Sequence, residues 1–172
     1  MRITLELAYN RAVTHIPFNP LRIWWLRRLG ARLGRNVYLF AGSEVLQPSG
    51  LEIAGNCHIG RHSQIDARGG IRVGTNVVIA GHCLLLTADH DPQDSGFRGR
   101  LQGISIEDRV WIGSRATILK GVTLGEGSVI AAGATVIHDV PAWSMVAGVP
   151  AKIVGHRSHE QNYQIDYGPS FY

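Results

Sequence analysis

Large aliphatic residues recur at every sixth position through the middle of the chain: Ile106, Ile112, Ile118, Leu124, Ile130 and Val136. The residue four positions after each of them is small or β-branched. Steps of six residues turn an α-helix by about 600°, so these aliphatic residues would spiral over all faces of a helix instead of forming a stripe. A short strand in each unit, followed by a corner, places every one of them inside a three-sided parallel β-helix.

The same register recurs upstream in three sets of three units, which span 33–49, 53–69 and 73–89 and are separated by extra residues around Gly50 and Gly70. With the central series they make fifteen units, which predicts about five coils if three units close one coil. At the usual strand spacing, five coils would stand roughly 24 Å tall. The pattern therefore predicts an all-β fold, a parallel β-helix, and it does not indicate the handedness.

One segment interrupts the repeat. The register stops after Leu85 and resumes at Ile104, and the residues between, 86–103, are polar and include glycines. Such a segment is expected to leave the stack at a corner as an extruded loop within a β-helix domain that spans 33–155. It holds an Asp-His-Asp triplet at 89–91. Because loops held by a rigid scaffold often carry function, this loop is the first place to look for a site.

A short helix is expected ahead of the repeats, in the N-terminal segment 1–32. Asn19 is predicted as its N-cap, Pro20 as its first residue and Gly30 as the residue just past its end. The side chains expected to be buried are those of Leu21, Trp24 and Trp25, and those expected on the opposite side are Arg22, Arg27 and Arg28. Two roles remain open for this helix. It could cap the open end of the β-helix, or its basic, Trp-bearing face could lie on a membrane.

Charge is concentrated in the same N-terminal part of the chain. Residues 1–36 contain seven arginines and one glutamate, whereas the rest of the chain carries ten basic and twelve acidic residues. Nucleic-acid binding would need a basic stripe with stacking aromatic residues or a recognisable module. Neither is found, so nucleic acid is not expected as a partner. Attraction to an anionic membrane surface remains open.

The composition is that of a turn-rich globular protein. Of the 172 residues, 45% are hydrophobic and 21 are glycines, a share that argues against a helix bundle. No apolar run approaches the ~18–20 residues of a spanning helix, and the first residues lack the apolar region of a secretory signal. With only two cysteines, a cytoplasmic protein is expected. The polar tail, 156–172, shows no repeat and is expected to be a partly ordered extension.

Three motifs within 104–154 carry a resemblance to a known family: VWIG, the GAT–V–DVP block and the closing AGVPAKIV. They resemble hexapeptide-repeat acetyltransferases, in particular sugar O-acetyltransferases of the maltose, galactoside and nodulation-factor type. The segment HIPFNPLRIWWLRRLGARLG ahead of the repeats is most similar to the colanic-acid and exopolysaccharide acetyltransferase branch. The resemblance covers about 33–155. It implies a left-handed β-helix, a homotrimer, acetyl-CoA as the acyl donor and no required metal.

The resemblance also implies a catalytic base. In the family a histidine of the extruded loop removes the proton of the acceptor, and His90 falls at the matching place. An imidazole suits this step because it titrates near neutral pH. Asp89 and Asp91 are both candidates for orienting the ring, and the sequence does not choose between them. Trp111, in VWIG, resembles the family's tryptophan whose indole ring forms one wall of the catalytic pocket. By spacing alone, His90 would be a solvated loop histidine, and outward packing against a neighbouring subunit is an alternative role for Trp111.

Family members bind acyl-CoA along a groove between adjacent subunits, mostly through backbone groups, which requires small residues there. The matching positions are Ala80, Ser114, Ala131, Ala132 and Gly133 and, where the last coil ends, Gly148, Pro150, Lys152 and Arg157. Lys152 or Arg157 would contact the nucleotide phosphates. His138 stands where the family often has a basic residue. Small residues are also common in this fold for packing alone.

The remaining histidines and the cysteines are expected to be structural. His58, His62 and His82 lie on outward repeat positions, and no two histidines have the separation of five residues found in zinc-binding hexapeptide-repeat carbonic anhydrases. No metal site is therefore expected. Cys57 and Cys83 occupy the small inward position of their units and are expected in the core.

These features together predict an acetyl-CoA-dependent O-acetyltransferase that modifies a hydroxyl of a sugar or glycan precursor in polysaccharide or glycolipid synthesis. Two alternatives remain: N-acetylation of an amino sugar or an antibiotic, and a non-catalytic β-helix scaffold. The expected location is the cytoplasm, with peripheral membrane contact through the N-terminal helix left open.

Overall fold

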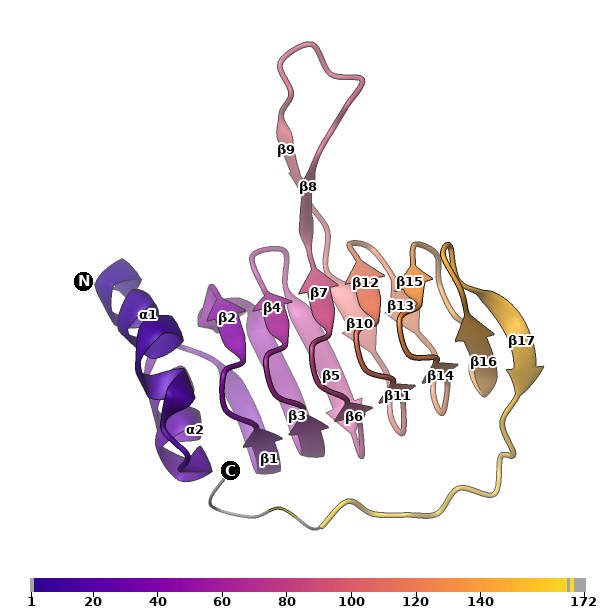
Figure 1. The fold of residues 1–172 in the computed structure, drawn as a ribbon, viewed down its shortest axis with the longest axis horizontal. Helices are drawn as coiled ribbons and strands as arrows, with labels where there is room; N and C mark the ends of the chain where they lie inside the picture. Colours follow the sequence, from indigo (N-terminus) through magenta and orange to yellow (C-terminus); the bar gives the residue numbers. More distant parts are fainter. Residues whose placement is uncertain (1, 167, 169–172) are drawn as a thin grey trace.

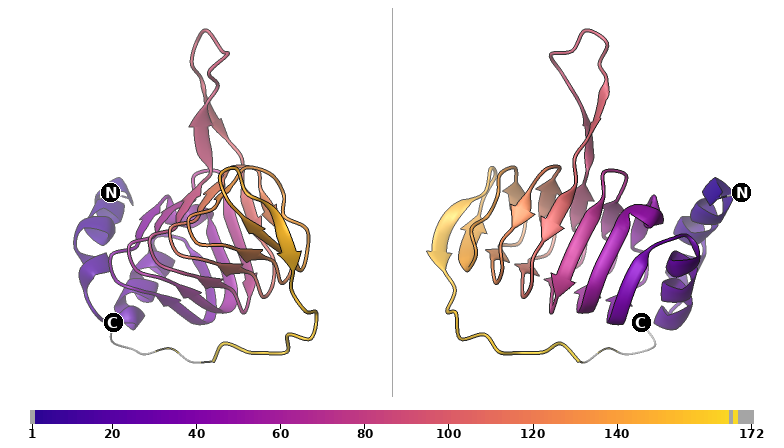
Figure 2. Two further views of the ribbon diagram at one scale, coloured as in Figure 1. Left: turned by 45° about the vertical axis from the view of Figure 1, so that its right-hand side comes forward. Right: turned by 180° about the vertical axis from the view of Figure 1, so that it is seen from behind.

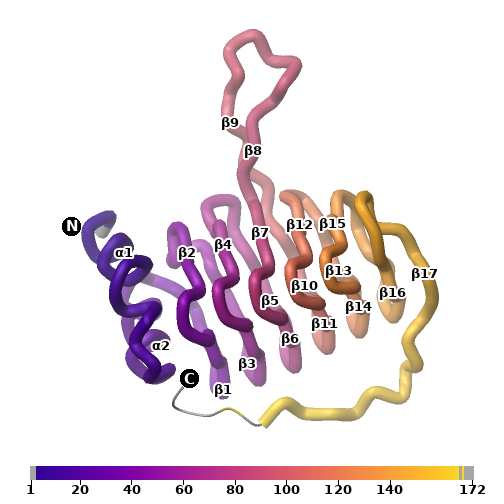
Figure 3. Tube along the Cα trace, in the orientation of Figure 1, coloured from indigo at the N-terminus to yellow at the C-terminus, as the bar shows by residue number. Residues whose placement is uncertain are grey.

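The computed structural model describes residues 2–166 and 168, and it shows a three-sided stack of parallel strands (Figures 1 and 2). The fold is thus the predicted parallel β-helix, and successive turns pair in register, with Leu33 opposite Ile53 and Ile53 opposite Val73. The strands lie on three faces. Two helices stand at one end of the stack, and a hairpin projects from its side (Figure 3).

The strands fall into one column per face. The first face contains β1 (Arg32–Leu39), β3 (Leu51–Ile59), β5 (Ile71–Thr75), β10 (Ile104–Ile106) and β13 (Thr123–Leu124). β1 and β3 continue round the corner onto the second face, which is completed by β6 (Val78–Ile79), β11 (Trp111–Ile112), β14 (Val129–Ile130) and β16 (Ser144–Ala147). The third face contains β2 (Glu44–Leu46), β4 (Gln64–Asp66), β7 (Leu84–Leu86), β12 (Thr117–Leu119) and β15 (Thr135–Val136). A 3-10 turn, η2 (Pro48–Gly50), links β2 to β3.

The aliphatic residues of the six-residue register form the core. Ile112, Ile118 and Ile130 are fully buried. Cys57 and Cys83 are also fully buried, as predicted, and burial raises the pKa of both thiols. The small or β-branched residue four positions after each aliphatic is buried as well, as at Ala116 and Ala134. The residues directly beside an aliphatic position in the same strand point outward, since side chains alternate along a strand.

The described residues make about six turns, one more than the sequence indicated. Val140 forms a bridge with Leu124, and Val146 pairs with Ile130, which extends the first and second faces by one rung. The repeat count missed this turn because Val140 follows Val136 after four residues instead of six.

The interruption between the third and fourth coils is an antiparallel hairpin. Its strands are β8 (Ala88–His90) and β9 (Gly99–Leu101), and it rises from the end of the third face after β7 (Figure 1). Its base is tied to the stack, because the hydroxyl of Thr87 donates to the carbonyl of Asp66 and the Thr87 carbonyl accepts from the amide of Gln102.

Two helices and a 3-10 turn cover the N-terminal end of the stack: α1 (Arg2–Arg11), η1 (Val13–His15) and α2 (Asn19–Arg28). The sequence predicted α2 and missed α1. The assignment of Asn19 as N-cap was wrong, since Phe18 holds that position and no side chain caps the helix. Asn19 is buried instead. Its amide donates to the Val37 carbonyl and accepts from the Leu39 amide.

The predicted orientation of α2 was wrong at Arg22 and Trp24, whereas Leu21 and Trp25 pack against the core and Arg27 and Arg28 are exposed, as expected. Arg22 is 1% exposed and Trp24 is 50% exposed, the reverse of the expectation. The reason is that α2 crosses the open end of the β-helix, where carbonyls of the first coil lack a neighbouring strand. Nε of Arg22 donates to the Leu39 carbonyl at 2.9 Å, and its Nη1 donates to the Ile16 carbonyl. An arginine therefore faces the stack, because its guanidinium has several N–H donors for these carbonyls whereas a tryptophan has only one.

We expect Asn19→Ala to lower the free energy of unfolding by about 1–3 kcal/mol, because it leaves a buried carbonyl and a buried amide of β1 without partners. Urea unfolding followed by circular dichroism measures this change. Asn162→Ala, at an exposed tail position, is the matched control and is expected to change little. Equal effects of the two substitutions would contradict the proposed link between cap and coil.

The C-terminal segment closes the other end and then returns along the stack. β17 (Lys152–His156) pairs antiparallel with β16. Beyond it the tail runs back toward the helices (Figure 1), with the Tyr163 hydroxyl on the Arg109 carbonyl and the Ile165 amide on Asn76 Oδ1. Among the described residues, no helix has the length and apolar character needed to cross a bilayer.

Candidate active site

His90 lies at the end of β8 on the projecting hairpin, and its side chain is exposed. Its Nδ1 is 2.7 Å from the carbonyl oxygen of Phe97 across the hairpin, and the two rings stack at 4.4 Å with an interplanar angle of 3°. A carbonyl oxygen only accepts hydrogen bonds, so in the neutral ring Nδ1 carries the proton and Nε2 keeps its lone pair. The hairpin therefore presents an oriented imidazole whose Nε2 can accept a proton.

The two aspartates beside His90 do not contact its ring. Both bind Arg100 of β9: Asp89 receives two hydrogen bonds of 2.9 Å, and Asp91 lies 3.4 Å from Nη1. These hydrogen bonds from Arg100 lower the pKa of the Asp89 carboxyl below its usual value. Arg100 also reaches the His90 carbonyl at 3.4 Å. The aspartates therefore hold the hairpin around His90 through Arg100, and the His90 ring itself is held by the Phe97 backbone carbonyl.

A second contact joins the hairpin to the body of the β-helix. Lys120, just after β12, lies with its Nζ 3.4 Å from Asp89 Oδ2 and 2.9 Å from Gln102 Oε1. We name Asp89, Asp91, Arg100 and Lys120 the hairpin clamp. The sequence analysis missed Arg100 and Lys120. Arg100 could have been predicted, because antiparallel pairing of β8 and β9 places it directly opposite Asp89.

Trp111 lies on β11 and points outward from the second face, with 51% of its surface exposed. β11 lies at the lower edge of the stack in Figure 1, whereas the hairpin leaves from the upper edge. A single chain therefore does not bring Trp111 and His90 together.

The small residues predicted to form a groove do align, at the corner between the second and third faces. The amide of Ala80 donates to Ile112, that of Ala131 to Val146, and that of Gly133 to Ser114. Ala132 and Gly133 are exposed there. A packing reason for small residues is also present, since a Cβ on Gly113 would lie 2.6 Å from the Ala132 amide nitrogen.

The predicted residues at the C-terminal end are only partly brought together. Gly148 and Pro150 form the turn between β16 and β17, and Lys152 is exposed at the start of β17. Arg157 is committed to internal contacts, because its Nη1 donates to the Arg109 carbonyl at 3.0 Å and its guanidinium lies over the Tyr163 ring. His138 is exposed at a different corner, where the third face returns to the first.

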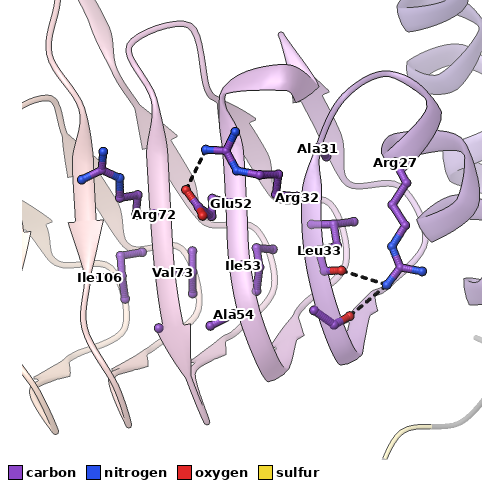
Figure 4. Close-up of a pocket in the computed structure, with 12 residues that line it drawn as sticks. Arg27, Ala31, Arg32, Leu33, Glu52, Ile53, Ala54, Arg72, Val73 and Ile106 are labelled. Atoms are coloured by element: carbon purple, nitrogen blue, oxygen red, sulfur yellow. Dashed lines mark hydrogen bonds and ion pairs between the residues drawn. The ribbon is translucent and has the colours of Figure 1, made fainter.

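A hollow of about 680 Å³ lies on the first face near the helices (Figure 4). Gly34, Ala54 and Gly74 are among the residues that line it, and Arg32, which binds Glu52 at 2.8 Å, lies at its edge. None of the predicted site residues lines this hollow.

The outward histidines do not assemble a metal site. The rings of His62 and His82 lie 5.2 Å apart on neighbouring turns. Across residues 2–166 and 168, no group of three or more His, Cys, Asp or Glu side chains is placed to hold a metal ion.

Comparisons with known proteins agree with this fold. A family model described as the hexapeptide repeat of succinyl-transferase matches residues 103–137. The putative colanic acid biosynthesis acetyltransferase WcaF of Escherichia coli is 28% identical over 136 residues, which cover 79% of this chain and 75% of that protein. A putative acetyltransferase of Schizosaccharomyces pombe is 46% identical over 88 residues, 48% of this chain, and the match spans only 41% of the yeast protein.

Among solved structures, a galactoside acetyltransferase in complex with coenzyme A superposes with a TM-score of 0.74 at 27% identity. The match covers 96% of this chain and 86% of the other.

Proposed function

We propose that this chain, which is similar to hexapeptide-repeat acetyltransferases, transfers an acetyl group from acetyl-CoA to a hydroxyl of a sugar or glycan precursor. The observation that carries the proposal is the hydrogen bond between His90 Nδ1 and the Phe97 carbonyl, since it leaves Nε2 as a proton acceptor on an exposed hairpin. A sugar acceptor is supported by the names of the relatives, a colanic acid biosynthesis enzyme and a galactoside acetyltransferase.

The chemical step proceeds as follows. His90 Nε2 accepts the proton of the acceptor hydroxyl while the hydroxyl oxygen attacks the carbonyl carbon of the thioester. The C–S bond then breaks, the new ester keeps the acetyl group, and the thiolate of CoA takes the proton back from the imidazolium. The Phe97 carbonyl holds Nδ1–H throughout, which keeps the ring in one orientation and stabilises its positive charge.

The acting unit is a homotrimer in which the hairpin of one protomer reaches the small-residue corner and Trp111 of the next. The support is that β8, which carries His90, and β11, which carries Trp111, lie at different edges of a single chain (Figure 1). Lys152 binds the nucleotide phosphates of the donor, because the Arg157 guanidinium is already held by the Arg109 carbonyl and the Tyr163 ring. The reaction belongs in the cytoplasm, where the free thiols of Cys57 and Cys83 persist.

Release of free thiol from acetyl-CoA, measured with a panel of sugars that includes one amino sugar, tests the proposal. Acceptor-dependent thiol release with hydroxyl-only sugars supports it. Turnover confined to the amino sugar would support N-acetylation instead, and no binding of CoA by calorimetry would support a non-catalytic scaffold.

The hairpin clamp provides a separate prediction. Arg100→Ala is expected to lower kcat by about 10–10²-fold with little change in the KM for acetyl-CoA, because a shift of about 1 Å in a reacting group can cost that much. Arg98→Ala is the matched control, since the Arg98 side chain binds Asp94 near the hairpin tip and only its backbone carbonyl, which the substitution keeps, contacts the clamp at the Asp91 amide. Steady-state kinetics distinguish the two variants. A loss confined to KM would contradict a positioning role for Arg100.

A further inference from the structure

The helices at the N-terminal end leave an exposed surface that the β-helix does not use. α2 buries Ile23 and Leu26 against the stack, while Trp24 on its other side is half-exposed. On α1, Ile3 is 78% exposed, and Leu5 and Leu7 are also exposed. We name Ile3, Leu5, Leu7, Trp24 and Arg28 the cap face.

Direct contacts join the two helices. The indole of Trp25 donates to the Leu5 carbonyl at 3.2 Å, and its ring lies 6.0 Å from that of Trp24. The guanidinium of Arg28 lies 5.3 Å from the centre of the Trp24 ring. The exposed aromatic side chain is thus held beside a positive charge, an arrangement suited to a boundary between an apolar and an anionic layer.

The charge around the cap face is strongly positive. Residues 1–36 hold seven arginines and one glutamate, and that glutamate, Glu6, accepts a hydrogen bond from the Gln47 amide. Arg11, Arg27 and Arg35 are exposed alongside Arg28.

We propose that the cap face is a docking surface for an anionic phospholipid bilayer. Trp24 and the leucines of α1 enter the interfacial layer, and the arginines contact lipid phosphates. Charge complementarity favours this occupant over a second copy of the chain, because a symmetric contact would place the arginines of one cap against those of the other. The cap face lies at the helical end of the stack, away from the hairpin base in Figure 1, so docking would leave His90 accessible.

This inference does not depend on acyl transfer, although the proposed trimer would strengthen it. Rotation about a threefold axis keeps every copy at the same height, so three cap faces would meet one plane together. Binding through three linked surfaces is tighter than through one.

Co-sedimentation with vesicles tests the proposal. The full chain is mixed with vesicles of phosphatidylcholine alone or of phosphatidylcholine with phosphatidylglycerol. We expect binding only to the anionic vesicles, weakened by salt. Arg28→Gln is expected to lower the partition coefficient about fivefold, in line with the contribution of one arginine at a charged membrane surface. Trp24→Ser is expected to lower it at least as much.

Two matched controls are available. Arg72→Gln removes an exposed arginine of the first face, and Val154→Ser removes an exposed apolar side chain at the opposite end of the stack. Both should sediment nearly as the parent chain does. Absence of binding to anionic vesicles, or equal binding to neutral ones, would overturn the proposal. A fall in molar mass by light scattering for Trp24→Ser, without vesicle binding by the parent chain, would assign the cap face to a subunit contact instead.

Discussion

Replacing His90 with asparagine is expected to lower kcat for acetyl transfer by about 10²–10⁴-fold, the usual contribution of a positioned general base. The asparagine amide retains a donor that can reach the Phe97 carbonyl, so the hairpin conformation is preserved while the proton acceptor is lost. Thiol release measured under saturating acetyl-CoA and acceptor gives the change in kcat directly.

Two further measurements make this prediction specific. The affinity for CoA should be nearly unchanged in His90→Asn, because the proposed donor groove lies on the β-helix and not on the hairpin. His15→Ala removes an exposed histidine at the end of η1 and should retain full turnover. Undiminished turnover by His90→Asn would remove the basis of the proposed mechanism.

The second large effect concerns stability. Ile118→Ala is expected to lower the free energy of unfolding by about 2–5 kcal/mol, because Ile118 is fully buried between Leu85 and Val136 of adjacent turns. The cavity would lie in the narrow interior of the stack, where neighbouring strands are fixed by their ladders and cannot collapse to fill it. Urea unfolding at one fixed protein concentration measures the loss, since association of subunits would otherwise contribute.

Leu119→Ala is the matched control for this substitution. Leu119 is the next residue of β12, has the same number of carbons and points outward, where it is partly exposed. Its loss should cost far less than that of Ile118. Equal destabilisation by the two substitutions would mean that the inward and outward positions had been assigned to the wrong residues.

The position of the hairpin was predictable from the break in the register, whereas its internal contacts were not. The Asp-His-Asp triplet pointed to a carboxylate as the partner of His90, because those groups are adjacent in sequence. In the structure the antiparallel pairing places Asp89 opposite Arg100, so the carboxylate is taken up by a guanidinium and the ring turns to the Phe97 carbonyl. Such a choice depends on cross-strand geometry, which a local pattern does not contain.

The orientation of the N-terminal helix α2 could also not be predicted from a local pattern. Hydrophobicity alone placed Trp24 inside and Arg22 outside, and the structure has the opposite arrangement. The open end of a β-helix presents unpaired backbone groups, so the side chain that satisfies them is polar. The need for a polar side chain comes from the coil beneath the helix, so the amphipathic pattern of the helix itself does not indicate it.

The amino-acid sequence by itself determined the period of the coils, the aliphatic interior and the point at which the stack is interrupted, because a strand of fixed rise and a corner of fixed length repeat the same local requirement every six residues. The tertiary structure alone decided the orientation of the His90 ring, the clamp around it, the burial of Arg22 and the exposure of Trp24. Each of these depends on which groups from distant parts of the chain lack a partner once the turns have stacked.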